Sequence, residues 1–351
     1  MPTFIISLCD PHFSDKKPRS RRDDFIATQR RKLNDVMKLA GGFRWKDQLV
    51  QASAIAVGGD MFHQAKGRLI SRSLDQALCS QFKRSPCPIL AIAGNHDMDR
   101  DRLESLKEHP LGTLAASGLV KLVHWPDYVV IGGVADRPPV IVTGKQYVLE
   151  GPRSWLDMLR ETQKLAELKA VVHQDYPNAP AQAFVMTHNF WGPVDAMFQA
   201  EPILGHHHAA GTGANVILYG HPHTFDGTTE VEDGDYHVSV VGPGALIRGT
   251  IAEKDVRREP RIAITAFNED GTHEVMFVKI PHEPAESVFD LEQHERVRRE
   301  RTIQERFVRS LEELQTAQKK PEDILAQAER KVPMAVVTLA RSYLTQAEAE
   351  V

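Results

Sequence analysis

The chain has 351 residues, of which 42% are hydrophobic and 26% charged, so it can form one large domain with a smaller one beside it. Its formal net charge of -4 argues against a surface that binds nucleic acid everywhere, although a local basic patch is compatible with it. The three cysteines form no C-x-x-C pair, which disfavours a disulfide framework or a cysteine-type zinc site.

The N-terminal segment, "MPTFIISLCD", lacks the basic start of a secretory signal and ends in an acid. No run reaches the roughly 18 apolar residues that a membrane span needs. We therefore expect a cytoplasmic protein without membrane contact. Cys9 lies inside this first apolar run, where a buried structural thiol is expected.

Short apolar runs bounded by Gly, Pro or Asp predict strands at 4–8, 54–57, 89–93, 129–134, 183–187, 216–219, 238–241, 262–267 and 275–280. Helical spacing predicts helices within 21–42, 72–82 and 101–117, the last interrupted at Pro110. Strands alternate with helices first and follow one another later. This order predicts an α/β domain whose second half is largely antiparallel.

The composition changes near residue 284, where the chain becomes highly charged. We expect one domain over 1–283 and a small helical C-terminal region over 284–351. Its apolar stripe consists of Ile303, Phe307, Leu311 and Leu314. The stripe either packs within the chain or docks on a partner, and both possibilities remain open.

Five stretches carry Asp, Asn or His at or just after predicted strand ends, namely "LCDPH", "GGDMFH", "AGNHD", "MTHN" and "YGHPH". Loops after strand ends are where α/β sheets commonly gather a site. The spacings D-x-H and H-x-H put both side chains on one side of an extended segment. Oxygen and imidazole ligands without thiolates suit Mn²⁺, Fe or Zn²⁺. The candidate ligands are Asp10, His12, Asp60, Asn95, His188, His221 and His223.

The charge of this set indicates phosphate chemistry. Two carboxylates, one amide and four neutral imidazoles around two divalent ions leave a net charge of about +2, which attracts a phosphoryl oxygen. Two ions roughly 3.5–4 Å apart can activate water and clamp the attacking and leaving oxygens. A single strand-end Asp is most often a turn former, and a single His is most often a surface or core residue. The complete ordered set is improbable by chance.

The ordered set resembles the calcineurin-like metallophosphoesterase superfamily over about residues 3–245. The resemblance implies an α/β fold in which a two-sheet sandwich is flanked by helices (α/β/β/α), with two divalent metal ions at one rim. It implies that Asp60 bridges the two ions and that His96, which is not a ligand, stabilises the transition state or protonates the leaving oxygen. The first metal would be held by Asp10, His12, Asp60 and His223, and the second by Asp60, Asn95, His188 and His221.

Three segments are similar to SbcD-type DNA repair nucleases: "GGDMFHQAKGR", "VGPGALIRG" and "KIPHEP". The first implies that His63 assists catalysis near the metals, although a local hydrogen bond at a helix start is an alternative for His63. The G-D-x-V-D-R-G motif of protein phosphatases is absent. Gly242 and Ala245 depart from the family's N-P-G-S-x-x-R pattern, and the C-terminal region is short. Phage forms of SbcD-like nucleases are also shortened, and the chain is similar to them in this respect.

The resemblance predicts a metal-dependent DNA nuclease, exonuclease or endonuclease, with Mn²⁺ as the expected metal and Fe or Zn²⁺ as alternatives. DNA ends are the expected partner, and an SbcC-like ATPase or a second copy of the chain is a further possible partner. Two other functions stay open. One is a small-molecule or nucleotide phosphodiesterase or phosphatase of the same superfamily, and the other is a non-catalytic DNA-end-binding scaffold.

Three weaker features complete the set of expectations. The basic loop "DKKPRSRR" either grips backbone phosphates or is a solvated loop; its cationic residues are Lys16, Lys17, Arg19, Arg21 and Arg22. The histidines at 206–208 form either an extra metal site or, as we expect, a mobile loop. Asp97 is expected to orient the site rather than bind metal.

Overall fold

The computed structural model describes residues 1–18, 20–63, 70–99, 102–133, 137–149, 153–198, 200–233, 236–249 and 253–292, with isolated positions beyond. The chain divides into two compact units, Met1–Val288 and Phe289–Val351. The stripe expected at Ile303, Phe307, Leu311 and Leu314 lies outside the described residues. Among the described helices, none is both long enough and apolar enough to cross a membrane.

A six-stranded sheet forms one half of the larger unit. Its strands lie in the order β17 (His273–Lys279), β16 (Arg261–Phe267), β1 (Thr3–Leu8), β4 (Ala54–Val57), β5 (Ile89–Ala91) and β6 (Lys121–Leu122). β1, β4, β5 and β6 are parallel, whereas β16 pairs antiparallel with both β1 and β17. The strands predicted within 4–8, 54–57, 89–93, 262–267 and 275–280 all belong to this sheet.

A second six-stranded sheet has the order β14 (Gly227–Asp233), β15 (Tyr236–Gly242), β13 (Val216–Gly220), β9 (Gln182–His188), β8 (Val140–Lys145) and β7 (Val129–Ile131). The expectation of a largely antiparallel second half holds for β16 and β17, which pair antiparallel in the first sheet, but not for the centre of this second sheet. β15, β13, β9 and β8 are parallel, and only the edge strands β14 and β7 pair antiparallel. Between β8 and β9 the helices α4 (Arg153–Thr162) and α5 (Lys164–Asp175) return the chain, as a parallel pair requires.

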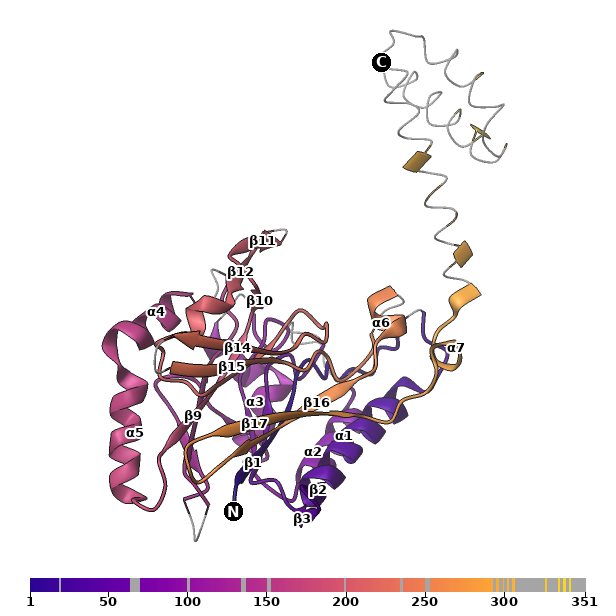
Figure 1. Ribbon diagram of the computed structural model, residues 1–351. Coiled ribbons are helices and arrows are strands. Elements are labelled where there is room, and N and C mark those ends of the chain that lie inside the picture. The colour runs from indigo at the N-terminus through magenta and orange to yellow at the C-terminus, as the bar shows by residue number, and fades with distance from the viewer. Residues whose placement is uncertain are drawn as a thin grey trace. The chain divides into compact units, whose positions relative to one another are not determined.

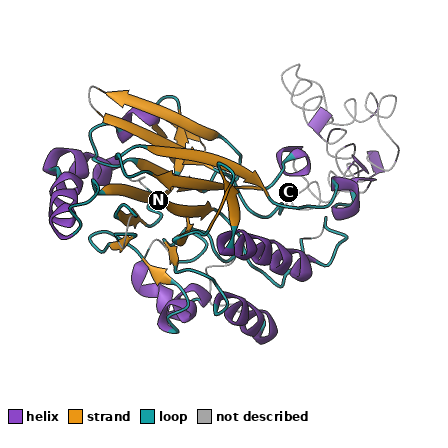
Figure 2. Ribbon diagram, turned by 60° about the horizontal axis from the view of Figure 1, so that its bottom comes forward, coloured by secondary structure: helices purple, strands orange, loops and turns teal. Residues whose placement is uncertain are grey.

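Helices cover the outer faces of the two sheets, which pack against each other (Figures 1 and 2). The first sheet is covered by α1 (Phe25–Gly41), α2 (Arg72–Phe82), the 3₁₀ helix η1 (Leu103–Glu108) and α3 (Pro110–Ala116). α4 and α5 cover the second sheet. The predicted sandwich with helices on both sides is therefore confirmed. Two short helices, α6 (Glu253–Arg257) and α7 (Ala285–Val288), lie near the end of the larger unit.

The core has layers because strand side chains alternate between the two faces of a sheet. In β1, Phe4 and Ile6 pack in the layer under the helices, whereas Ile5 packs between the sheets. Cys9 lies fully buried in the layer between the sheets, as expected for a structural thiol. Alternate side chains thus give each sheet two apolar faces, which explains the continuous apolar runs in the sequence.

Local signals set the helix boundaries. Asp24 precedes α1, and its side chain accepts a hydrogen bond from the backbone N–H of Ala27. Ser71 caps α2 in the same way, through the N–H of Leu74. Pro110 occupies the first turn of α3, so the expected interruption at this proline separates η1 from α3.

The chain between β9 and β13 forms a separate three-stranded sheet, which we call the arm. It consists of β10 (Phe190–Gly192), β12 (Glu201–Gly205) and β11 (Ala196–Phe198), in that spatial order. The arm projects from the body of the larger unit (Figure 1). It is followed by the 3₁₀ helix η2 (His206–Ala209). A hairpin of β2 (Phe43–Trp45) and β3 (Gln48–Val50) follows α1.

Candidate metal centre

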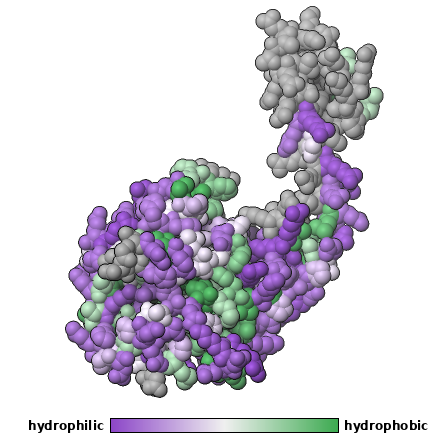
Figure 3. Space-filling model, in the orientation of Figure 1, coloured by the Kyte–Doolittle hydropathy of each residue, from purple (hydrophilic) through white to green (hydrophobic). Residues whose placement is uncertain are grey.

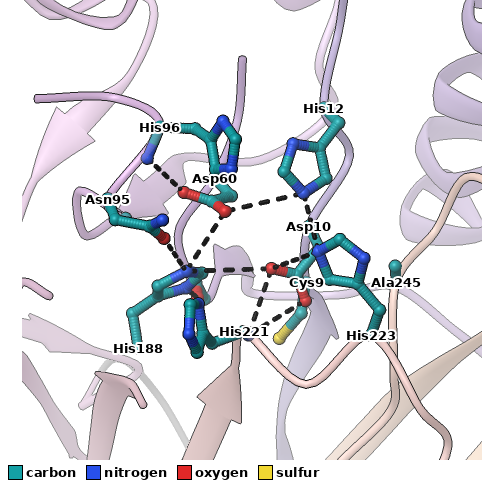
Figure 4. A network of polar contacts seen from close by, with 12 residues as sticks. Cys9, Asp10, His12, Asp60, Asn95, His96, His188, His221, His223 and Ala245 are labelled. Carbon is teal, nitrogen blue, oxygen red and sulfur yellow. Dashed lines mark hydrogen bonds and ion pairs between the residues drawn. The ribbon is translucent and has the colours of Figure 1, made fainter. Parts of the chain in front are cut away.

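Five strands end at one rim of the two sheets. β1, β4 and β5 are parallel neighbours in the first sheet, and β9 and β13 are parallel neighbours in the second. Figure 4 shows that the side chains at or just beyond these strand ends lie close together. Segments as distant as His12 and His223, 211 residues apart, come into direct contact there. The residues brought together are Asp10, His12, Asp60, Asn95, His188, His221 and His223.

One half of the rim cluster consists of Asp10, His12, Asp60 and His223, whose ligand atoms all lie within 4.8 Å of one another. Nε2 of His12 lies 2.8 Å from Nε2 of His223 and 3.5 Å from Oδ2 of Asp60. Nε2 of His223 lies 3.9 Å from Oδ1 of Asp10. The spacing of these nitrogen and oxygen atoms suits one shared cation.

The other half consists of Asp60, His188 and His221, again with ligand atoms within 4.8 Å of one another. Nε2 of His188 lies 3.3 Å from Oδ2 of Asp60 and 3.2 Å from Oδ1 of Asn95. Asp60 belongs to both halves and is 1% exposed. Its carboxylate therefore occupies the position that a residue bridging two ions needs.

The backbone is strained at the rim cluster. Among the described residues, eight that are not glycine have a positive φ. Five of them belong to this cluster: Asp10 (49°), His12 (46°), Asp60 (49°), His221 (95°) and His223 (59°). Each such conformation costs on the order of 1–3 kcal/mol and persists only where the surroundings enforce it. The strain indicates that the surrounding fold holds these side chains in orientations that converge on one site.

Hydrogen bonds to backbone and carboxylate groups fix the orientation of two imidazoles. Nδ1 of His188 lies 2.8 Å from the carbonyl oxygen of Gly58, to which it must donate. Nε2 of His188 is thereby turned toward Asp60 and Asn95. Nε2 of His221 lies 2.7 Å from Oε2 of Glu201. Metal-binding histidines commonly have their second nitrogen held in this way.

The electrostatics of the cluster show an excess of buried negative charge. Burial raises the pKa of Asp10 to about 7, although the charge of His188 acts to lower this pKa. Burial would also raise the pKa of Asp60, but the charges of His188 and His12 hold it below its ordinary value. Burial would lower the pKa of His188, yet Asp60 and Asp10 raise it to about 9. A proton on His188 thus offsets only part of the charge of two buried carboxylates, and a divalent cation would supply the rest on binding.

The residues present fit two metal ions. Oδ2 of Asp60, which faces Nε2 of both His12 and His188, is buried and accepts no hydrogen bond of standard geometry within the described structure. Buried polar atoms normally make one, so this unsatisfied oxygen indicates a missing ligand. Burial holds the pKa of His223 at about 4, which keeps this imidazole neutral, as metal ligation requires. The donors are oxygen and imidazole nitrogen, a set that suits Mn²⁺, Fe or Zn²⁺.

The calcineurin-like phosphoesterase family matches residues 10–225, more than half of the chain, and the match spans the segments from Asp10 to His223. The chain belongs to the calcineurin-like phosphoesterase family. Among solved structures, calcineurin-like phosphoesterase YfkN from Bacillus subtilis is similar, at 11% identity and a TM-score of 0.45. That match covers 81% of this chain and 93% of YfkN. No curated protein sequence matches this chain.

Calcineurin-like phosphoesterases use a dinuclear divalent metal centre, and the rim cluster supplies candidate ligands for it. His96 lies at the edge of this cluster. Its backbone N–H donates to Oδ1 of Asp60 at 2.8 Å. Its Nδ1 lies 2.7 Å from the carbonyl oxygen of His63, to which it must donate. Nε2 of His96 is therefore the nitrogen left for another partner.

His63 stacks on His96, with ring centroids 5.4 Å apart and an interplanar angle of 12°. Both rings also contact His12 edge-on. The structure thus places the two residues predicted to be catalytic side by side at the family's metal centre. His12, His63 and His96 form a further group whose ligand atoms lie within 4.8 Å of one another, so geometry alone leaves a ligand role open for His96.

Two residues outside the candidate ligand set support the rim cluster. Asp97 is buried and accepts hydrogen bonds from the backbone N–H groups of Met61, Phe62 and Gly94. It ties the turn after β4 to the turn after β5, which matches the orienting role expected for it. Glu201 lies in the arm and contacts His221. No motif marks Glu201, because its position next to His221 depends on how the arm folds.

Two pockets adjoin the metal centre of this phosphoesterase. The first has a volume of about 290 Å³, and His12, His63 and His223 line it together with Lys16, Lys17 and Asp255, whose carboxylate is paired with Arg258. We call it the basic pocket. The second has a volume of about 690 Å³ and reaches Asp60, His96, His221 and His223 on one side and the arm on the other. We call it the arm pocket.

Two of the weaker expectations need correction. Arg21 cannot grip a substrate phosphate, because it is 4% exposed, is paired with Asp23 and donates to the carbonyl of Arg248. The histidines at 206–208 form the helix η2 rather than a loop. The ligand atoms of Asp195, His207 and His208 lie within 4.8 Å of one another, so the alternative of an extra metal site stays open. Of these, His208 is buried, with Nε2 3.0 Å from Oδ1 of Asp195. Arg19 lies outside the described residues.

Proposed function

We propose that this phosphoesterase is a metal-dependent DNA nuclease of the SbcD type. The observation that carries the proposal is the basic pocket, which places Lys16 and Lys17 beside the candidate metal ligands His12 and His223. A phosphomonoester presents one phosphate to the metals. A polynucleotide carries a second phosphate next to the one being cleaved, and the two exposed ammonium groups are positioned to bind it.

Buried positive charge next to the basic pocket supports the proposal that the substrate is a polyanion. Three guanidinium groups, from Arg21, Arg248 and Arg258, are each at least nine-tenths buried near the segment 245–249. Two carboxylates, of Asp23 and Asp255, pair with this group. The buried amine of Lys32, which donates to the carbonyl of Leu246, belongs to the same group, so cationic side chains outnumber the two carboxylates and leave an excess of positive charge. Poorly screened by water, it raises the potential in the pocket that Ile247 and Gly249 line.

The chain's own residues account for the steps of hydrolysis. When bound, two divalent ions supply Lewis acidity and lower the pKa of a coordinated water. Asp60, Asn95 and the imidazoles of the rim cluster would hold these ions. His96 presents Nε2 at the edge of the cluster, where it donates a proton to the departing oxygen of the ester. His63 holds the His96 ring through its carbonyl and by stacking.

Replacement of both exposed lysines tests the nuclease proposal. In Lys16→Ala/Lys17→Ala the kcat/KM for DNA should fall, and its slope against log salt should become shallower by about 1–2, the contribution of one or two phosphate contacts. The small diester bis-p-nitrophenyl phosphate lacks a flanking phosphate, so its hydrolysis should fall far less. The control Lys38→Ala/Lys121→Ala changes two exposed lysines elsewhere. An equal effect of both double variants on DNA would contradict the proposal.

A small-molecule or nucleotide phosphodiesterase is the second candidate, and the arm pocket favours it. Its volume of about 690 Å³ lies within the range of pockets that hold single small molecules. Turnover separates the two candidates. A nuclease cleaves internal or terminal links of an oligonucleotide, whereas a nucleotide phosphodiesterase hydrolyses a dinucleotide or cyclic nucleotide and leaves longer DNA intact.

A further inference from the structure

The arm carries exposed apolar side chains beside a polar metal centre. All three residues of β11 are exposed, with Met197 at 66% and Phe198 at 50%. Val194, in the turn before β11, is 64% exposed. Figure 3 shows hydrophobic colour at the projecting arm, within a mostly hydrophilic surface. Clustered exposed apolar residues at a pocket edge indicate a binding surface, because they are unfavourable in water.

Aromatic rings form a continuous path from the metal centre to the arm. The ring of Phe190 lies 4.5 Å from that of His221, centroid to centroid, and nearly perpendicular to it. The ring of Phe198 lies 5.2 Å from that of Phe190. Both phenylalanines line the arm pocket, which also reaches Asp60 and His96. An ester whose phosphate lies at the metal centre therefore has its organic group within reach of these rings.

The far side of the arm pocket is polar. Tyr219 donates a hydrogen bond to Asp226 at 2.9 Å, and Thr229 and His206 also line the pocket. A flat ligand with an apolar face and polar edges would match both sides at once. A nucleobase has this character, and aromatic side chains stack on bases of any sequence because every base has a π-face.

We infer that the arm pocket binds an unpaired nucleobase of the DNA strand being cleaved, stacked on Phe198, with the inclined ring of Phe190 beside it. This inference rests on the proposed nuclease function and adds a substrate class to it, namely single-stranded DNA or frayed ends. A base inside a duplex is covered on both faces by its neighbours, so it offers no face for stacking. The basic pocket then binds the phosphate and the arm pocket the base, on two sides of the metal centre.

The test compares two oligomers with the same phosphates, oligothymidylate and an abasic tetrahydrofuran oligomer of equal length. Wild-type enzyme with Mn²⁺ should cleave oligothymidylate with a kcat/KM on the order of 10-fold or more above the abasic oligomer, since stacking favours the first. In Phe198→Ala this preference should fall to near one. Phe198→Trp should keep it, because indole also stacks. Tyr128→Ala removes an aromatic residue of similar exposure (42%) that lines neither pocket and should leave the preference unchanged.

The outcomes separate the inference from the function on which it rests. If wild type cleaves both oligomers equally, or if Phe198→Ala slows both by the same factor, the base-stacking inference is wrong while the nuclease function stands. If wild type hydrolyses bis-p-nitrophenyl phosphate but neither oligomer, the nuclease function itself is wrong. Thermal melting of Phe198→Ala shows whether the arm variant is folded, and Phe198→Leu, which keeps apolar bulk without a π-face, should lose the preference as well.

Discussion

Glu201 and His221 are in direct contact, with Oε2 of Glu201 2.7 Å from Nε2 of His221. Glu201 begins β12 of the arm, whereas His221 follows β13 at the rim of the sheets. This contact links the arm to the rim cluster, together with the contact of the Phe190 ring on His221. A carboxylate in this position orients the imidazole and increases its basicity as a ligand.

Glu201→Gln keeps the size of the side chain and removes its charge. The affinity for Mn²⁺ should fall about 10- to 100-fold, because the imidazole of His221 loses its charged partner. Calorimetric titration of metal-free protein with Mn²⁺ measures this, and thermal melting should show an intact fold. The control Glu167→Gln changes an exposed glutamate on α5. Unchanged Mn²⁺ affinity in Glu201→Gln would show that the contact is incidental.

His96→Ala and Asp60→Ala separate catalysis from metal binding. His96→Ala should retain both metals and lose activity on the order of 10²–10⁴-fold, the contribution of a group that transfers a proton. Asp60→Ala should lose metal as well, because the carboxylate shared by both halves of the cluster is removed. Metal content by elemental analysis, measured beside activity, decides the assignment. Loss of metal in His96→Ala would make His96 a ligand.

Gly94→Ala should disrupt the rim cluster by a steric clash with Asp60, although it removes no candidate ligand. A Cβ at Gly94 would lie 2.1 Å from Oδ1 of Asp60 and 2.4 Å from its backbone nitrogen, so the turn after β4 must shift. We expect loss of activity and of metal affinity. Gly41→Ala, whose Cβ would meet only Pro86 at 3.8 Å, serves as the control and should be neutral. An active Gly94→Ala enzyme would mean that Asp60 tolerates displacement.

The meeting of the candidate ligands at one rim was predictable because it depends on local rules. A polar residue directly after a buried strand, as at Asp10 or Asp60, stands out from its neighbours, and parallel strand ends meet at one edge. The strands themselves follow from apolar runs. The parallel pairing of the strands in the second sheet could not be predicted from the sequence. It depends on the helices α4 and α5, whose charged sequence gave no clear helical pattern. The strand β8 was itself not among the predicted strands, so its parallel pairing with β9 could not be predicted either.

Contacts between distant segments could not be predicted. The sequence indicates that Arg21 is a surface cation in a basic loop. In the structure its guanidinium donates to the carbonyl of Arg248, which lies 227 residues away in the chain. Glu201 and the aromatic residues of the arm have no spacing that marks them, since a three-stranded arm with two- to three-residue turns resembles a loop in sequence. Their roles come from where the arm is placed beside the rim.

The stability of the fold should decrease in mild acid, partly through His124. Nε2 of His124 accepts a hydrogen bond from the N–H of Ala93 at 3.0 Å, and burial lowers its pKa to about 4. Between pH 6.5 and 4 the unfolded chain binds a proton at His124 that the folded chain does not. The free energy of unfolding should therefore fall as pH drops through this window, by on the order of 1–3 kcal/mol from this residue.

Urea unfolding at pH 7 and pH 4.5 measures this effect. The difference between the two pH values should be smaller in His124→Gln, whose amide oxygen still accepts from Ala93 but does not titrate. The control His207→Gln changes a histidine that is 62% exposed. If His124→Gln and wild type lose the same free energy, protonation of His124 does not destabilise the fold.

Direct assay of purified protein tests the central claim, that the rim cluster is the metal centre of a DNA nuclease. Wild type and Asp60→Ala are incubated with Mn²⁺ and end-labelled single-stranded or blunt duplex DNA, in parallel with bis-p-nitrophenyl phosphate. The account predicts that wild type cleaves the diester and the DNA, single strands faster than duplex, and that EDTA or Asp60→Ala abolishes both activities. Hydrolysis of the diester with intact DNA, or DNA cleavage that persists in Asp60→Ala, would contradict it.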